Sequence, residues 1–298
     1  MIHFSRFTKI YALISMIVIG FGLYSILQWG YIYSIDFTGG TEVRYAISGA
    51  SESKLPEVLT SAAIEKSLGS LSSSLESSRV RGTELTIRTA TMDKEDEKQF
   101  RTALAKETGL EITLLRFDEV GPTIAQDMIY KTLVALGVGM IIILGYIFFA
   151  FKKFTFALAA VLAMLHDVLV VAGTYSLMSH FWGAQLDTLF VTAILTTMSF
   201  SVHDTIVIFD KIREDRKHVA GKSMDELADR AVSSTMIRSL NNSLTIMFML
   251  VALVALGGDS IRFFALALLT GTVTGAYSSP FVATPLALAL ERYFKKSN

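Results

Sequence analysis

Long apolar runs separated by short polar stretches dominate the chain. Since about 20 apolar residues cross the hydrocarbon core of a bilayer as a helix, six runs are predicted to span it: 10–27, 132–151, 154–177, 186–209, 237–256 and 263–290. A cleaved signal peptide is the alternative for the first run, but no Ala-x-Ala site follows it. The pattern predicts a polytopic α-helical membrane protein with six transmembrane helices in a one-plus-five arrangement.

Between the first two apolar runs, residues 30–123 carry charges of both signs and no long apolar run. Their periodicity predicts a strand at 43–47, a helix at 53–68, two strands at 79–89 around Gly82, a helix at 93–106 and a strand at 110–117. The serine-rich segment 67–78 is expected to be a loose loop. The order β-α-β-β-α-β predicts a ferredoxin-like α+β domain between helices 1 and 2.

Basic residues gather on one side of the predicted spans, at the ends of the first, second, fourth and sixth (Arg6, Lys9, Lys152, Lys153, the loop from Lys211, Arg292, Lys295 and Lys296). The short loops on the other side offer only Arg262. By the positive-inside rule both termini are cytoplasmic and the domain is extracytoplasmic. The predicted parts are 1–29 (cytoplasmic N-terminus and helix 1), 30–123 (extracytoplasmic domain), 124–291 (helices 2–6 with a cytoplasmic loop, 211–236) and 292–298 (cytoplasmic tail). The charged segment 211–230 has a helical pattern and is expected to lie along the cytoplasmic face.

An acidic residue interrupts the fourth apolar run. Asp204 follows an apolar stretch and precedes another, and a mid-span Asp costs roughly 2.5 to 3.5 kcal/mol on insertion scales, so it is a functional candidate. In the next span Arg238, Asn241, Asn242 and Thr245 share one helical face by their spacing. Thr197, Ser201 and Thr205 form a matching polar stripe beside Asp204. Because lipid cannot satisfy such stripes, we predict that they face each other and that Asp204 pairs with Arg238.

Two other groups of small residues have a predicted structural role. Gly271, Gly275 and Ser279 recur every four residues in the sixth span, as in helices that approach another helix closely. Pro280 and Pro285 are expected to bend the inner half of that span. After the first span, Asp36, Gly39 and Gly40 predict a tight turn at the membrane surface, with glycines for positive φ.

Composition narrows the classes of function. The 298 residues are 52% hydrophobic, with a mean hydropathy of +0.49. A net charge of zero argues against a nucleic-acid partner, because no basic excess is present to neutralise phosphates. The absence of Cys excludes disulfides and thiolate metal sites. His166–Asp167 and His203–Asp204 lack the spacing of a known metal motif, so no metal or cofactor is expected, and the chain is not expected to be an enzyme.

Six ordered motifs resemble the SecF family, the smaller subunits of the SecD–SecF accessory complex of bacterial protein export. They are Ile35-Asp-Phe-Thr-Gly-Gly-Thr41, Val120-Gly-Pro122, His166-Asp167, His203-Asp-Thr-Ile-Val-Ile-Phe-Asp-Lys-Ile-Arg-Glu214, Arg238-Ser-Leu-Asn-Asn-Ser-Leu-Thr245 and Tyr277-Ser-Ser279. The likeness extends over the whole chain. It departs from the family at His203, where Asn is usual, and at residues 199–201, where Gly-Tyr-Ser is usual.

The resemblance implies a member of the resistance-nodulation-division superfamily in the bacterial cytoplasmic (inner) membrane. It implies SecD, the SecYEG channel, an unfolded secretory polypeptide and membrane lipid as partners, with YajC as a further candidate. The residues that match Asp204 and Arg238 belong to the proton pathway in that family, and His203, Thr205, Asn241 and Asn242 lie beside them. One charge that crosses about 100 mV gains about 2.3 kcal/mol. This energy is large enough to drive the binding or release of a proton by the carboxyl group.

Other interpretations of the same residues remain open. Asp204 and Arg238 can form a purely structural ion pair, and His203 can donate a structural hydrogen bond instead of relaying protons. The whole chain can be a non-transporting scaffold subunit or half of a proton-coupled small-solute transporter, since such transporters share this logic of intramembrane charges. An intramembrane protease has weak support, because no second membrane Asp accompanies Asp204 in a protease motif.

Overall fold

The computed structural model describes residues 4–49, 55–151, 153–219 and 221–296. Within those residues, six helical segments are long and apolar enough to cross a membrane. Five are single helices and the sixth is broken: α1 (Thr8–Trp29), α6 (Pro122–Phe151), α7 (Phe154–Trp182), α8 (Thr188–His218), α9 (Met224–Leu256), and α10 (Asp259–Ser278) with α11 (Thr284–Lys296). A short 3-10 turn, η1 (Phe4–Phe7), precedes α1. The chain is a polytopic helical membrane protein, as the hydrophobic pattern predicts.

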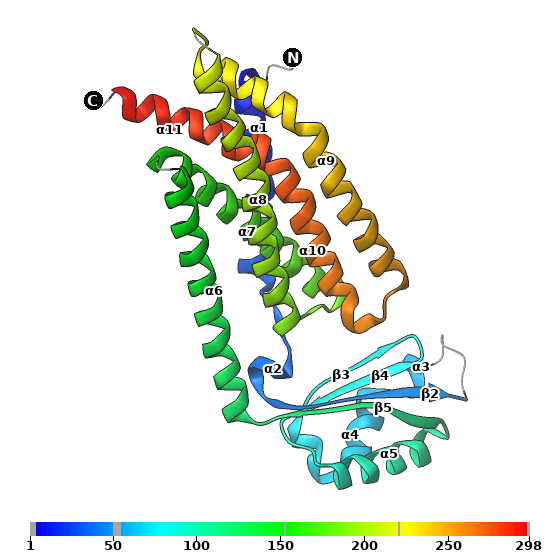
Figure 1. The fold of residues 1–298 in the computed structure, drawn as a ribbon. Coiled ribbons are helices and arrows are strands. Elements are labelled where there is room, and N and C mark those ends of the chain that lie inside the picture. Colours follow the sequence, from blue (N-terminus) through cyan, green and yellow to red (C-terminus); the bar gives the residue numbers. More distant parts are fainter. Residues whose placement is uncertain (1–3, 50–54, 152, 220, 297–298) are drawn as a thin grey trace. The chain divides into compact units, whose positions relative to one another are not determined.

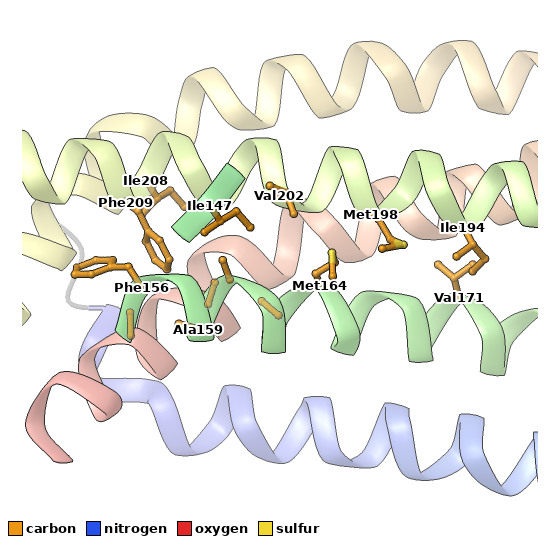
Figure 2. Close-up of a cluster of buried hydrophobic side chains, with 14 of the residues drawn as sticks. Ile147, Phe156, Ala159, Met164, Val171, Ile194, Met198, Val202, Ile208 and Phe209 are labelled. Atoms are coloured by element: carbon orange, nitrogen blue, oxygen red, sulfur yellow. The ribbon is translucent and has the colours of Figure 1, made fainter. Parts of the chain in front are cut away.

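The described chain divides into two compact units, Tyr33–Lys131 and the remainder. In the helical unit, α7 packs against α1, α8, α10 and α11, and α8 also packs against α9 and α10. Figure 2 shows the apolar side chains that fill the space between α7 and α8, among them Met164, Met198 and Phe209. Each of these three is at most 1% exposed. This tight packing fixes the faces that α8 turns toward its neighbours.

The charged segment predicted as a separate cytoplasmic helix belongs to two of the spanning helices. Helix α8 continues to His218, and α9 begins at Met224, directly after its cap residue Ser223. The Ser223 hydroxyl accepts a hydrogen bond from the Glu226 N–H, and the Glu226 carboxylate accepts one from the Ser223 N–H. This capping box fixes the start of α9. The predicted loop 211–236 is therefore mostly helical extension of the spans, and residue 220 within it lies outside the described residues.

The sixth span bends where its prolines predict. A π-helical turn, η4 (Ser279–Ala283), separates α10 from α11, and Pro280 lies at its start. Proline has no N–H to donate and its ring disturbs the preceding turn, and single π-turns are a known way for a helix to accommodate such a break. Helix α11 is thus set off from the part of the span that contains Gly271 and Gly275.

The unit Tyr33–Lys131 contains a four-stranded antiparallel sheet in the order β3-β4-β2-β5. Its elements are β1 (Ile32–Tyr33), α2 (Ile35–Thr38), β2 (Gly40–Ser48), α3 (Leu55–Val58), α4 (Ser61–Leu68), η3 (Gly69–Ser74), β3 (Leu75–Arg81), β4 (Glu84–Thr89), α5 (Lys94–Thr108) and β5 (Glu111–Val120). A further two-residue strand, β6 (Gln185–Leu186), lies between α7 and α8 in the chain. Figure 1 shows α4 and α5 together on one face of the sheet.

Local sequence signals explain most of this unit. In β2, Val43, Tyr45 and Ile47 alternate inward and are at most 3% exposed. The Asp93 carboxylate caps α5, and Gly109 ends it with a left-handed φ of 69°. The prediction of a loose loop at 67–78 was wrong, because α4 and η3 occupy its first part and β3 begins at Leu75. Of the single helix predicted at 53–68, residues 53 and 54 lie outside the described residues, and the rest is divided into α3 and α4, with residues 59 and 60 in neither.

Candidate functional site

Asp204 lies on α8 with only 8% of its surface exposed. The Ser243 hydroxyl of α9 donates to its Oδ2 atom at 3.5 Å. A second hydroxyl of α9, that of Ser239, lies close enough to the carboxylate to interact with it. Ser239 and Ser243 are four residues apart, so they lie one above the other on the same helical face. The carboxylate is therefore held by neutral hydroxyl donors at the junction of α8 and α9.

The structure does not bring Arg238 to Asp204. Across the described part of the chain no ion pair of 4 Å or less joins these two residues, and the Arg238 side chain is exposed. The reason is the rotation of α9. Ser239 and Ser243 each follow a residue of the predicted stripe by one position, which on an α-helix is a turn of about 100°. The predicted face exists, but α9 turns its neighbouring face toward Asp204.

The remaining members of the predicted proton pathway divide into exposed and buried residues. His203, Asn241 and Asn242 are exposed on α8 and α9. Thr205 is 1% exposed, and its hydroxyl donates to the Ser201 carbonyl at 2.9 Å. The exposed residues lie in helices that span the membrane by length and composition. Their polar groups therefore require a partner outside the described chain or a water-filled surface.

The small-residue stripe of the sixth span packs as predicted, and its partner is the polar stripe of α8. A Cβ atom added at Gly271 would lie 2.1 Å from the Thr197 Oγ1 atom, and one at Gly275 would lie 3.4 Å from the Ser201 Cα atom. Ser279 continues the contact, since its hydroxyl lies 3.0 Å from that of Thr205. Only small residues permit this approach of two helices. We call this contact the α8–α10 seam.

A polar cavity of about 650 Å³ opens between α6, α8 and α9. Its charged lining residues are Asp210, Lys211, Glu214 and Arg238. A smaller cavity of about 170 Å³ lies between α8, α9 and the sixth span, and Ser239 is one of its few polar lining residues. Arg238 thus shares a cavity with the acidic residues near the charged end of α8.

The predicted turn after the first span is present in the unit Tyr33–Lys131. Gly39 and Gly40 have φ values of 74° and 107°, and a Cβ atom at Gly40 would lie 2.7 Å from the Thr89 carbonyl oxygen. The N–H of Asp36 donates to the Ser34 hydroxyl at 3.2 Å. Arg88 secures the turn by donating to the Tyr33 carbonyl at 2.6 Å and to the Thr38 hydroxyl at 3.0 Å. No sequence pattern predicts this role of Arg88.

The sequence pattern does not predict the two serines of α9 that lie near Asp204. Ser239 and Ser243 lie one position beyond Arg238 and Asn242, so they fall outside the polar stripe that the spacing predicts. In the described residues no group of three or more His, Asp or Glu side chains is placed to hold a metal ion. The candidate site consists of the buried Asp204 carboxyl group and the hydroxyl groups around it.

Comparison with known proteins agrees with this architecture. A family model described as "Protein export membrane protein SecD/SecF, C-terminal" matches residues 100–293. The protein translocase subunit SecF of Thermobaculum terrenum is 35% identical over 98% of this chain and 94% of its own length. The subunit SecF of Sebaldella termitidis is 37% identical over 96% of this chain and 91% of its own length.

A solved crystal structure is similar as well. SecDF from Thermus thermophilus, described as a translocon-associated membrane protein, superposes with a TM-score of 0.83 at 29% identity. The alignment covers 98% of this chain but only 39% of that longer chain. A second structure, of SecDF in a super-membrane-facing form, gives a TM-score of 0.67 over the same share of both chains. On the family match and the near full-length relatives, this chain belongs to the SecF family of protein translocase subunits.

Proposed function

We propose that this chain works with a SecD partner to draw secreted polypeptides through the SecYEG channel, and that the proton-motive force drives the process. The observation that carries the proposal is Asp204, a carboxyl group buried in a spanning helix, which accepts a hydrogen bond from the Ser243 hydroxyl and lies near the hydroxyl of Ser239. Such a group is expensive to keep charged in a membrane, so it is a candidate to bind and release protons.

We propose that Asp204 alternates between two environments. Hydroxyl partners suit a protonated carboxyl group as well as a charged one, because a hydroxyl can donate or accept. Arg238 lies on the same helix as those hydroxyls but on a different face. A rotation or shift of α9 that brings Arg238 to Asp204 would favour the charged carboxylate. We propose that this exchange of hydroxyl for guanidinium accompanies proton release toward the cavity that contains Asp210 and Glu214.

We propose that SecD covers the exposed polar face of α8 and α9, which consists of His203, Arg238, Asn241 and Asn242. Amide and guanidinium groups within a spanning segment are otherwise left facing lipid, where nothing satisfies their hydrogen bonds. The similarity to SecDF supports a partner of the SecD kind. Thr205 would contribute from the buried side, through the α8–α10 seam.

The remaining assignments are part of the same proposal. The strand order β3-β4-β2-β5 with α4 and α5 on one face supports a ferredoxin-like fold for the unit Tyr33–Lys131. The distribution of Lys and Arg supports an extracytoplasmic position for it, with both termini in the cytoplasm and the chain in the bacterial inner membrane. Further proposed partners are the unfolded secretory polypeptide, membrane lipid and YajC. The chain is proposed to act without an enzymatic step, a cofactor or a nucleic acid.

The proposal is tested by proton flux in proteoliposomes that contain the full chain, its SecD partner and an unfolded secretory polypeptide under an imposed pH gradient. We expect Asp204→Asn to abolish polypeptide-stimulated flux while the complex still assembles. Asp127→Asn, a change at an exposed carboxylate of α6, is the matched control and should retain the flux. Equal flux in wild type and Asp204→Asn would overturn the proposal and favour a non-transporting scaffold. Flux that depends on a small solute would instead favour half of a small-solute transporter.

A further inference from the structure

A second buried carboxyl group lies outside the proposed proton pathway. Asp167 of α7 is 0% exposed. The Ser278 hydroxyl, at the end of α10, donates to its Oδ2 atom at 2.6 Å. The Nδ1 atom of His166 lies 2.9 Å from its Oδ1 atom. Both carboxyl oxygens of Asp167 are therefore engaged, one within α7 and one on α10.

The same cluster reaches α1. The Nε2 atom of His166 lies 3.0 Å from the Ser15 hydroxyl, and the His166 ring stands near the Tyr277 ring, with centroids 6.4 Å apart. The Tyr277 hydroxyl in turn donates to the Tyr11 carbonyl of α1 at 3.1 Å. If Asp167 is charged it can only accept, so His166 donates through Nδ1 and accepts the Ser15 hydroxyl at Nε2. The cluster joins α1, α7 and α10 in one hydrogen-bonded unit.

The residue after Ser278 belongs to a different network. Because the Thr205 hydroxyl donates to the Ser201 carbonyl, the Ser279 hydroxyl donates to the Thr205 hydroxyl at 3.0 Å, and the Ser201 carbonyl is a weaker alternative acceptor for it at 3.4 Å. Both partners are on α8, and Thr205 is the chain neighbour of Asp204. Ser278 and Ser279 thus face two different helices from consecutive positions, and each is 0% exposed.

The two networks meet at the one irregular turn of the sixth span. Ser279 is the first residue of the π-helical turn η4, and Pro280 follows it. A π-turn is less regular than the helix on either side, and such turns are frequent at functional sites. A change in the hydrogen bond between Asp167 and Ser278 therefore acts on Ser279 directly, through one peptide unit. From Ser279 it reaches α8 at Thr205.

We propose that Asp167 is a positioning residue for Asp204, acting through Ser278, Ser279 and Thr205. While Asp167 accepts the hydrogen bond from Ser278, the η4 turn keeps α8 at the position along α9 at which Asp204 contacts Ser243. Release of that hold lets α8 shift and exposes the Asp204 carboxyl group. A buried polar cluster that only stabilised the bundle would affect folding without this selective effect on Asp204. The inference deepens the proposed function, but its central test does not require transport.

The test measures how fast a lipid-soluble carbodiimide, which reacts with protonated carboxyl groups, modifies Asp204 in the full chain in lipid nanodiscs, with peptide mass spectrometry as the readout. We expect Asp167→Asn and Ser278→Ala to speed modification of Asp204 about three- to tenfold, the size of effect that one net hydrogen bond produces. Ser279→Ala should have the same effect. Combining Asp167→Asn with Ser279→Ala should add little further, since both act on one path.

Ser176→Ala is the matched control. Ser176 is also on α7 and 0% exposed, but it bonds Ser25 and the Gly30 carbonyl outside the cluster. The proposal is overturned if Asp167→Asn and Ser278→Ala leave the Asp204 rate unchanged or slower, or if Ser176→Ala speeds it equally. If Asp167→Asn does not fold, Ser278→Ala alone decides. Should proton flux be absent while the labelling effects hold, the proposed function fails and the positioning role stands.

Discussion

Helix α8 carries two polar faces that the structure treats in opposite ways. The face with Thr197, Ser201 and Thr205 is buried against α10. The face with His203 is exposed, and so are Arg238 and Asn241 of α9. Both faces lie in the same span, so their sequence surroundings do not explain the difference. The size of the polar groups does.

Small hydroxyls can be satisfied inside a seam between two helices. Thr205 donates to the carbonyl of Ser201 on its own helix, and that arrangement takes no space from the neighbour, so α10 can approach as far as Gly271 and Gly275 allow. Amide and guanidinium groups have several donors and need more partners than one backbone carbonyl provides. They therefore suit a face where another chain or water supplies the partners. The inner face closes the bundle, and the outer face is the one that we propose SecD covers.

The strongest way to break the inner face is to add volume to it. Gly271→Leu places a side chain where a Cβ atom alone would lie 2.1 Å from Thr197 Oγ1. Because overpacking of a close contact costs about 1 to 3 kcal/mol or more, we expect a loss of about 3 kcal/mol in the free energy of unfolding. The measurement is denaturant unfolding of the purified chain in detergent.

Gly137→Leu is the control for that substitution. Gly137 lies in α6, and no atom lies within 4 Å of an added Cβ atom there. The control should leave the free energy of unfolding within about 0.5 kcal/mol of wild type, as for surface changes in general. Similar losses in both variants would mean that the cost comes from replacing glycine in a membrane helix and not from the α8–α10 seam.

The sequence predicts the seam well but not the neighbour of Asp204. Four-residue spacing of small residues identifies Gly271, Gly275 and Ser279 as a contact face, and the number and order of the spans follow from hydrophobicity. Helical spacing says which residues share a face, but not which helix that face meets. A rotation of α9 by about 100° decides whether Arg238 or the serines contact Asp204, and helical spacing does not specify that rotation. Asp167 is a similar case, because its partner Ser278 comes from a distant span.

The outer face is tested by removing its amides. The double substitution Asn241→Leu with Asn242→Leu should lower recovery of a co-expressed SecD partner about tenfold, which corresponds to about 1.4 kcal/mol. The unfolding of the chain alone should change little, since both residues are exposed. Pull-down from detergent extracts measures the association.

Replacing Asn241 with Gln serves as the conservative control, because it keeps an amide at the same position. We expect near wild-type recovery of the partner from Asn241→Gln. If the Leu double variant still recovers the partner fully, this face is not the contact with SecD. If it unfolds the chain instead, the two faces of α8 and α9 do not differ as we argue.

The smallest expected effect compares two neighbouring residues of α9, Ser243 on the face that contacts Asp204 and Asn242 on the exposed face. Ser243→Ala removes the hydroxyl that donates to Asp204 Oδ2 at 3.5 Å. Since one hydrogen bond contributes about 0.5 to 1.5 kcal/mol net, we expect proton flux in proteoliposomes with SecD to change about three- to fivefold. Asn242→Ala alters the adjacent residue, which points to the exposed face, and should change the flux of assembled complexes less than twofold. A larger effect from Asn242→Ala than from Ser243→Ala would mean that Asp204 depends more on the outer face of α9 than on the Ser243 hydroxyl.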